Sequence, residues 1–379
     1  MNEDIRTQGL RALERSVRRD LTNLCRPPAN WVPPRRVDGE DVVDVVIIGG
    51  GMCGLLAHFA LTCAGITNIR ILDRAPAGEE GPWVTYARME TLRSPKQLVG
   101  PAFGLGSLTF RAWFTAQFGE REWDRLDKIP RPMWMDYLKW YRHVLAVPVE
   151  NGVRVRTIAP ESEHVRLHLE GAPEPSIVAR KVVMATGREG LGHANIPGFV
   201  DDLPRERWAH SSDEIDFAAL KGKRVVVIGV GASAVDNAAE AVEHGASEVR
   251  FLIRRREMPT VNKMMGIGSY GFTCGYAELP DEWRWRFMRY SFVTQTPAPR
   301  GSTMRVSRHP NATFHFGKSI DAMRMDGSDV LIAMCDGSRL ATDFVILGTG
   351  FTIDPLARTE FGDNADKILL WRDRYTPPP

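Results

Sequence analysis

The chain has 379 residues, of which 43% are hydrophobic and 25% charged, a composition typical of a globular protein with one large or two medium domains. Its formal net charge is +2, too small for the strongly basic surface expected of a protein that binds nucleic acid or a membrane surface. We therefore predict neither a nucleic acid nor a membrane as a partner. Five scattered cysteines without a C-x-x-C pair argue against a disulfide framework and a dithiol redox centre, and they favour a reducing, cytoplasmic location. We expect neither a signal peptide nor a membrane span.

Residues 1–40 are predicted to form an amphipathic helix and a proline-rich linker. The segment IRTQGLRALERSVRRDLTNL places apolar side chains at helical spacing among arginines, and prolines 27, 28, 33 and 34 follow it. We expect the apolar stripe to pack on the body of the protein. Contact of this basic-flanked helix with a membrane is the alternative.

A first glycine turn lies between an apolar strand and a helix in DVVDVVIIGGGMCGLLAHFAL. Gly49 allows the tight turn, Gly51 allows a pyrophosphate to approach the backbone, and Gly54 allows the helix to pack closely on the strand. Met52 and Cys53 open the helix, whose N-terminal N–H groups can bind phosphates. This pattern predicts a dinucleotide-binding site.

The segment GKRVVVIGVGASAVDNAAEAVEHG repeats this pattern. Gly229 and Gly231 take the first two glycine positions, and Ala234 takes the third, which spaces helix and strand slightly. Ala232 and Ser233 open the second helix. The repeat predicts a second dinucleotide-binding site.

The strands that follow the two turns end in opposite charges. Asp73, followed by Arg74, lies 24 residues after Gly49, where a carboxylate can accept hydrogen bonds from ribose hydroxyls. Arg254 and Arg255 take nearly the same place in the second unit, where a guanidinium can bind a 2′-phosphate. We therefore predict FAD in the first site and NADPH in the second. A merely solvated basic strand end is the alternative.

Each unit is followed by a polar hairpin and an apolar strand ending in Thr-Gly, at 165–189 with Gly187 and at 330–351 with Gly350. This duplication predicts an α/β fold with two Rossmann-like, doubly wound dinucleotide-binding domains, the NADPH domain inserted into the FAD domain. The predicted parts are residues 41–202 for the FAD domain, 203–342 for the NADPH domain with an insertion at 262–316, and 343–379 for the return to the FAD domain. The insertion is expected to be a substrate-side cap or an ordinary surface insertion.

These motifs resemble the flavin-dependent, NADPH-using monooxygenases with two dinucleotide-binding domains. EGPWVTYARMETLRSPK (80–96) resembles their Gly-Gly-Thr-Trp segment and Pro-Lys turn, RWAHSSDEIDF (207–217) resembles their His-Ser linker, and LGTGF (347–351) resembles their Ala-Thr-Gly-Tyr/Phe element. Together with WMDYLKWYR, these segments look closest to a bacterial subfamily that includes aspartate N-oxidising, nitrite-forming enzymes and a urate hydroxylase.

The resemblance implies that NADPH reduces FAD, and that a flavin C4a-hydroperoxide formed with O₂ oxygenates a small polar, nitrogen-containing substrate. It also implies further cofactor-binding residues. Those expected near the flavin are Trp83, Met89, Ser94 and Lys96, with Arg93 over the ring; those expected at the nicotinamide cofactor are His210 and Ser211. Arg93 and His210 are the candidate catalytic residues, and no metal site is predicted.

Two departures from the family limit this interpretation. The Baeyer–Villiger signature is absent after Phe199, which disfavours ketone oxygenation. Only 28 residues follow Phe351, so we expect either a truncated chain or a flavin site completed differently. The alternative functions are an NADPH:flavin oxidoreductase or oxidase that releases hydrogen peroxide, and a non-catalytic dinucleotide-binding redox sensor. The sequence leaves a homo-oligomer open.

Overall fold

The computed structural model describes residues 3–378, and at positions 264, 267 and 268 it describes the backbone only. The chain forms two compact units. The first contains the chain up to Thr85, then Thr91–His193 and Ile353–Ile368. The second contains Tyr86–Glu90, Ala194–Thr352 and the chain from Leu369 onward.

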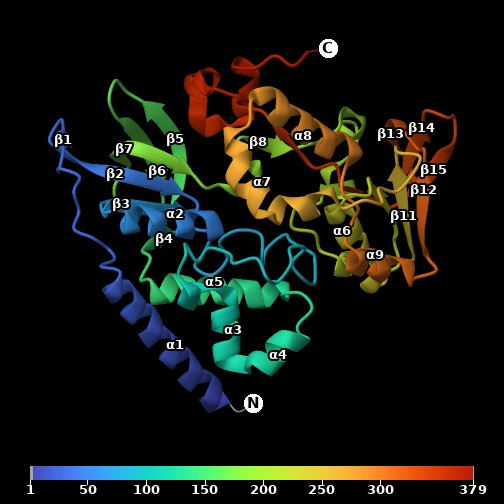
Figure 1. The fold of residues 1–379 in the computed structure, drawn as a ribbon. Coiled ribbons are helices and arrows are strands. Elements are labelled where there is room, and N and C mark those ends of the chain that lie inside the picture. Colours follow the sequence, from blue (N-terminus) through green and yellow to red (C-terminus); the bar gives the residue numbers. More distant parts are fainter. Residues whose placement is uncertain (1–2, 379) are drawn as a thin grey trace. The chain divides into compact units, whose positions relative to one another are not determined.

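The first unit is built on a mixed sheet with the strand order β4-β3-β2-β7-β6-β5 (Figure 1). Four strands are parallel, β2 (Glu40–Ile48), β3 (Ile69–Asp73), β4 (Val149–Asn151) and β7 (Ser176–Met184). Strands β5 (Arg154–Pro160) and β6 (Val165–Glu170) continue the sheet antiparallel, and β1 (Arg36–Val37) pairs with β2. Helix α2 (Met52–Cys63) packs on β2 and β3. The carboxyl ends of β2 and β3 thereby lie beside the start of α2.

The first unit also contains helices before and between its strands. They include α1 (Glu3–Asn23), α3 (Phe110–Phe118), α4 (Glu120–Arg125), α5 (Arg131–Val144) and the short η1 (Gly106–Leu108). Helix α1 packs on α3 with Val17 fully buried, so the predicted packing of this helix on the protein is confirmed. Helix α5 contributes Trp134, Tyr137 and Tyr141 to the core, where all three are buried.

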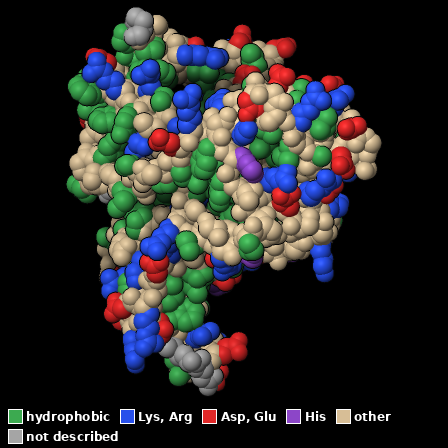
Figure 2. All heavy atoms as spheres, turned by 90° about the vertical axis from the view of Figure 1, so that its right-hand side faces the viewer, with side chains coloured by type: hydrophobic (Ala, Val, Ile, Leu, Met, Phe, Trp, Pro, Cys, Tyr) green, Lys and Arg blue, Asp and Glu red, His purple; other side chains and the backbone are tan. Residues whose placement is uncertain are grey.

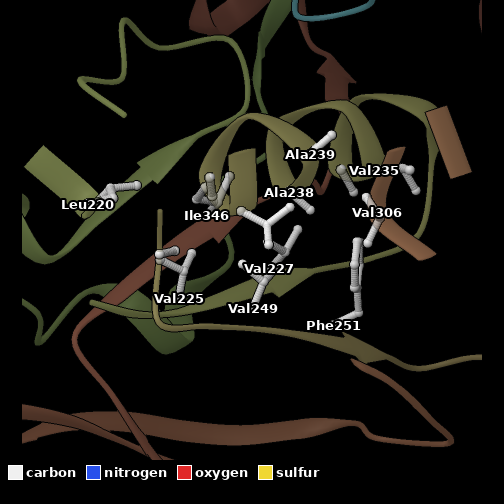
Figure 3. Packing of buried hydrophobic residues seen from close by; sticks show 14 of the residues in the cluster. Leu220, Val225, Val227, Val235, Ala238, Ala239, Val249, Phe251, Val306 and Ile346 are labelled. Carbon is white, nitrogen blue, oxygen red and sulfur yellow. The ribbon is translucent and has the colours of Figure 1, made fainter. Parts of the chain in front are cut away.

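The second unit is built on a five-stranded parallel sheet of the order β12-β11-β10-β16-β9. Its strands are β9 (Trp208–His210), β10 (Arg224–Ile228), β11 (Glu248–Ile253), β12 (Ala312–Phe316) and β16 (Phe344–Leu347). Val225 and Val227 pack under α6 (Ala232–Glu243), as Figure 3 shows, whereas Val226 and Ile228 belong to the core on the opposite face. Both faces of the sheet are therefore buried, as the uninterrupted apolar strands require.

The opposite face is covered by a separate antiparallel sheet of β13 (Ile320–Asp326), β14 (Asp329–Met334) and β15 (Arg339–Thr342).

In the first unit one long strand, β7, pairs both with the hairpin strand β6 and with the parallel strand β2. In the second unit β15 and β16 divide these two roles on either side of Asp343. The predicted duplication is therefore visible in the strand pairing, and the α/β fold class is confirmed.

Two predicted boundaries differ from the structure. Strand β12 is an edge strand of the parallel sheet and α9 (Arg300–Ser307) packs on α6, so the insertion ends before α9 and not at residue 316. It consists of η6 (Lys263–Gly268), α7 (Tyr270–Gly275), η7 (Tyr276–Glu278) and α8 (Asp281–Thr294). Strand β16 pairs with β10, so the second unit extends to Thr352, beyond the predicted limit at 342.

The last part of the chain contributes short elements to both units. In the first unit, η9 (Thr359–Lys367) follows η8 (Pro355–Ala357) and packs Phe361 against Ile158 of β5. In the second, η10 (Trp371–Asp373) packs Trp371 edge-on against Trp285 of α8. Strands β8 (Gly192–Ala194) and β17 (Phe351–Ile353) form a two-stranded sheet. The remaining 3₁₀ turns are η2 (Gly187–Glu189), η3 (Gly198–Val200), η4 (Arg205–Arg207) and η5 (Ala218–Leu220).

Candidate dinucleotide-binding sites

The first glycine turn is sterically closed to side chains at two of its three glycines. Gly49 has φ +109°, and an added Cβ would lie 2.4 Å from the carbonyl oxygen of Ala185. At Gly54 an added Cβ would lie 1.9 Å from the carbonyl oxygen of Gly49. Around Gly51 the nearest atoms to an added Cβ are 3.8 Å away. Gly51 is the N-cap of α2 and provides no side-chain hydrogen bond to the first N–H groups of the helix, at Met52 and Cys53, an arrangement that suits a pyrophosphate.

Asp73 lies at the end of β3 and is anchored to this turn. Its Oδ2 accepts a hydrogen bond from the Gly50 N–H at 2.7 Å, and its Oδ1 accepts one from the Ala75 N–H at 2.7 Å. Each carboxylate oxygen retains a lone pair, so the group can still accept hydrogen bonds from ribose hydroxyls. Arg74 is exposed next to it.

A pocket of about 380 Å³ lies between this turn and α5. Ligand pockets typically fall at about 300–1,000 Å³, so its size suits part of a dinucleotide. The lining residues come from the turn and α2, from the loop after β3, and from α5: Gly50, Gly51, Leu55, Ala77, Gly78, Glu80, Met135, Leu138, Lys139 and Arg142.

A buried ion pair forms the wall of this pocket and was missed from the sequence. Glu80, 4% exposed, accepts hydrogen bonds from Arg142 Nη1 at 2.7 Å and from Asn151 Nδ2 at 2.7 Å. Its other oxygen accepts from the Gly78 N–H, and Arg142 Nη2 donates to the Val149 carbonyl at 2.9 Å. The carboxylate is thus fully satisfied, and the loop after β3 is tied to α5 and β4. The sequence signals for this ion pair were Glu80 within EEGPW and the polar positions on α5, an otherwise apolar helix.

The segment expected near the flavin lies outside this pocket. Trp83 packs edge-on against Trp134 with ring centroids 6.3 Å apart, and Lys96 Nζ donates to the Trp123 carbonyl at 2.5 Å. Ser94 is half-buried and Arg93 is exposed. The remaining two expected residues are an exposed Gly187, with φ +79°, and Met89, which belongs to the second unit.

The second glycine turn has the same steric design. Gly229 has φ +96°, and an added Cβ would lie 2.9 Å from the carbonyl oxygen of Gly348. Ala234 is fully buried, and its methyl group leaves no room for a Cβ at Gly348, which would lie 2.4 Å from it. Among the atoms that the structure describes, none lies within 4 Å of a Cβ added to Gly231, which is the N-cap of α6 and makes no side-chain hydrogen bond. Ala232 and Ser233 begin that helix, so their N–H groups also suit a pyrophosphate.

The arginines after β11 differ in their contacts. Arg254 follows the last residue of the strand directly and is exposed. Arg255 is half-buried and donates from Nη2 to the Val293 carbonyl in the last turn of α8 at 2.6 Å. Arg255 therefore anchors α8, which makes Arg254 the better candidate for binding a phosphate.

The candidate catalytic residue His210 lies in the interior of the second unit. It is fully buried; its Nε2 faces the Gly350 carbonyl at 2.9 Å and its Nδ1 faces Ser212 Oγ at 2.7 Å. The ring also packs edge-on against Phe351. These contacts join β9 to the Thr-Gly element. Ser211 is buried as well, at 6% exposure. The expected contacts of both side chains with the nicotinamide cofactor stay predictions.

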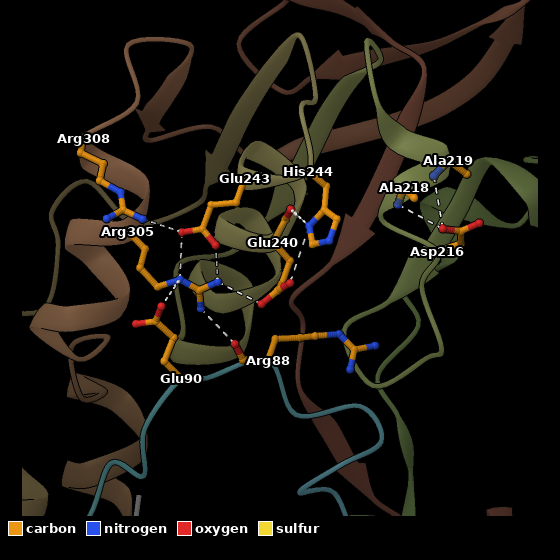
Figure 4. Close-up of polar contacts among 10 residues, drawn as sticks. All are labelled: Arg88, Glu90, Asp216, Ala218, Ala219, Glu240, Glu243, His244, Arg305 and Arg308. Atoms are coloured by element: carbon orange, nitrogen blue, oxygen red, sulfur yellow. Dashed lines mark hydrogen bonds and ion pairs between the residues drawn. The ribbon is translucent and has the colours of Figure 1, made fainter. Parts of the chain in front are cut away.

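A further buried charge cluster supports the second glycine turn (Figure 4). Arg305 of α9 is 5% exposed and bonds Glu243 at 2.6 Å and Glu240 at 2.9 Å, both on α6. Its Nη1 donates to the Arg88 carbonyl at 3.0 Å. The hydrogen bond from Arg305 lowers the pKa of Glu243, although partial burial opposes this. The cluster thus fixes α9 against the helix whose N-terminus forms the turn.

The surface carries both signs of charge. On the face drawn in Figure 2, Lys and Arg side chains are interspersed with Asp and Glu. Within residues 3–378, no helix is both long and apolar enough to cross a membrane. In the same described part of the chain, no three His, Cys, Asp or Glu residues are grouped as metal ligands.

Comparisons with known proteins agree with this geometry. Residues 46–266 match the pyridine nucleotide-disulphide oxidoreductase family. An FAD-dependent urate hydroxylase of Xanthomonas campestris pv. campestris is 40% identical over 378 residues, which cover 98% of this chain and 78% of that relative.

Solved structures with the same fold include amine hydroxylases. The ornithine N-hydroxylase of Kutzneria sp. 744 has a TM-score of 0.66 at 19% identity, covering 86% of this chain and 84% of that one. The cadaverine monooxygenase of Erwinia amylovora has a TM-score of 0.68 at 17% identity, covering 88% and 84%. The predicted resemblance is confirmed: the chain belongs to the pyridine nucleotide-disulphide oxidoreductase family and, within it, to the flavin-dependent monooxygenases.

Proposed function

We propose that this protein uses NADPH and FAD to oxygenate a small polar, nitrogen-containing substrate with O₂. The observation that carries the proposal is the pair of glycine turns, with Asp73 at the end of the strand after the first turn and Arg254 directly after the strand that follows the second. When bound, FAD supplies a hydride acceptor and the means to activate O₂. A cytoplasmic location is part of the proposal and rests on the cysteine pattern.

The chain's own residues would bind and orient the two dinucleotides. In the first unit the N–H groups at the start of α2 would bind the pyrophosphate, and Asp73 would accept hydrogen bonds from the ribose. In the second unit the start of α6 would bind the other pyrophosphate, and Arg254 would bind the 2′-phosphate that distinguishes NADPH from NADH. Because Asp73 lies in the first unit and Arg254 in the second, we place FAD in the first unit in this proposal.

Replacement of Arg254 tests the NADPH assignment. Arg254→Ala should reduce the preference for NADPH over NADH, measured as the ratio of kcat/KM values, by about 10- to 100-fold, the value of one or two charged hydrogen bonds. Arg324→Ala, an exposed arginine on β13, is the control and should leave the ratio unchanged. An unaltered ratio in Arg254→Ala would remove the assignment.

A substrate panel tests the oxygenation. Urate, the substrate in the name of the 40% identical relative, heads the panel, and ornithine, lysine and cadaverine follow as amines. The expected result is one compound that accelerates NADPH consumption without stoichiometric hydrogen peroxide. Peroxide equal to the NADPH consumed with every compound would support an oxidase instead.

A further inference from the structure

The pocket beside the first glycine turn contains a cation to which the proposed function gives no role. Lys139 of α5 lines the pocket opposite Gly50 and Gly51. Its side chain passes over Gly78, because a Cβ added there would lie 3.0 Å from Lys139 Cε and 3.3 Å from Nζ. No hydrogen bond or ion pair joins this ammonium group to another residue in the described part of the chain.

The other charges of the pocket are already compensated. Arg142 and Glu80 form the ion pair at 2.7 Å, and Glu80 also accepts from Gly78 and Asn151. Among the ten lining residues, all of them described, the uncompensated charge is therefore that of Lys139. The opposite wall is the start of α2, whose N–H groups add a partial positive charge. An anion in this pocket would meet donors on both sides.

We propose that Lys139 binds a phosphate oxygen of the dinucleotide in the first unit, as a phosphate-binding residue outside the glycine turn. This inference rests on the proposed function, which assigns FAD to that unit. A charge-assisted hydrogen bond from an ammonium group is roughly twice as strong as a neutral one, and the flexible lysine stem lets the cation follow the phosphate. The Glu80–Arg142 ion pair would act as a positioning pair, since it fixes the loop that passes under Lys139.

The test measures FAD binding to flavin-free protein by quenching of flavin fluorescence. Lys139→Gln removes the charge and should raise the Kd for FAD by about 10- to 100-fold. Lys139→Arg keeps the charge and should retain most of the affinity. The matched control is Lys181→Gln, which makes the same charge change at an exposed position on β7 outside the pocket and should bind FAD like the wild type.

A second probe isolates the phosphate contact. ADP carries the pyrophosphate without the flavin ring, and its affinity is measured by displacement of FAD. If Lys139 contacts a phosphate, Lys139→Gln should weaken the binding of ADP as much as the binding of FAD. If Lys139 contacts the flavin ring instead, the substitution should weaken the binding of FAD alone. An equal loss of affinity for FAD and ADP, with unchanged thermal unfolding of the flavin-free variant, supports the inference. A Kd for FAD equal to that of the wild type, or a loss confined to FAD, overturns it. Wild-type protein that binds ADP but not FAD would overturn the proposed function while leaving the phosphate contact measurable.

Discussion

The glycines of the first turn have separable roles, because an added methyl group would overlap backbone at one and fit at another. Gly54 would place a Cβ 1.9 Å from the Gly49 carbonyl oxygen. Gly51 has φ −71°, and its added Cβ would make ordinary van der Waals contact with Gly81 at 3.8 Å. The close contact at Gly54 holds α2 against β2. The methyl group tolerated at Gly51 would occupy the place where a ligand must approach.

We expect Gly54→Ala to lower the free energy of unfolding by about 1–3 kcal/mol or more, the usual effect of overpacking. Gly51→Ala should keep wild-type stability but bind FAD more weakly. Urea denaturation and FAD titration of both variants measure the two effects. Equal stability of the two variants would contradict the steric argument.

Buried His210 leads to a second prediction. Its removal would open a cavity in the core and take one of two hydrogen-bond partners from the Gly350 carbonyl, which also accepts from the Asn195 N–H at 2.9 Å, so His210→Ala should lower the free energy of unfolding by about 2–4 kcal/mol. Residual activity should keep the pH profile of the wild type. A stable variant with lost activity and an altered pH profile would instead support His210 as a catalytic residue.

Among the elements, the packing of α9 on α6 depends on a charged contact. Hydrogen bonds from Arg305 hold the pKa of Glu243 below its ordinary value of 4.5. Since the pKa is lower in the folded state, the pair contributes stability above about pH 4.5, and this contribution is lost as the pH falls through the folded-state pKa. The second unit should therefore lose stability in acid.

Glu243→Gln tests this contribution. The variant should be less stable than the wild type at pH 7, and its stability should fall less between pH 5 and pH 3, as measured by thermal unfolding. Glu257→Gln, an exposed glutamate outside the cluster, should retain the full acid loss of the wild type. Parallel pH profiles of Glu243→Gln and wild type would disprove the role of this carboxylate.

At the level of the elements, sequence patterns predicted the repeated units well but not their ends. The strand FVIL was predicted to belong with the first domain, yet β16 pairs with β10. Strand β12 was assigned to an insertion, yet it completes the edge of the parallel sheet. An apolar strand has the same pattern whichever sheet it joins, so its partner could not be read from its residues.

The whole molecule consists of two units, each with its own hydrophobic core and its own glycine turn. Ligands that bind one folded unit should stabilise that unit selectively. At 100 times its Kd, a ligand adds about 2.7 kcal/mol to the stability of the unit that binds it.

Calorimetry should accordingly show that FAD and NADP⁺ shift different parts of the unfolding transition. Gly51→Ala should abolish most of the FAD shift, and Gly231→Ala, which meets no atom within 4 Å, should abolish most of the NADP⁺ shift. A single transition moved equally by both ligands in both variants would contradict independent sites.

The two glycine turns and the charges at the following strand ends were predictable because each is a local pattern, read from a few residues whose conformation depends on their neighbours in the chain. The Arg142–Glu80 pair spans 62 residues, and the His210–Gly350 contact spans 140. No periodicity links such positions; strand order and helix packing bring them together. Folding therefore assigned His210 to the interior, Arg255 to α8 and Lys139 to the pocket, because burial and pairing depend on groups that are distant in the chain.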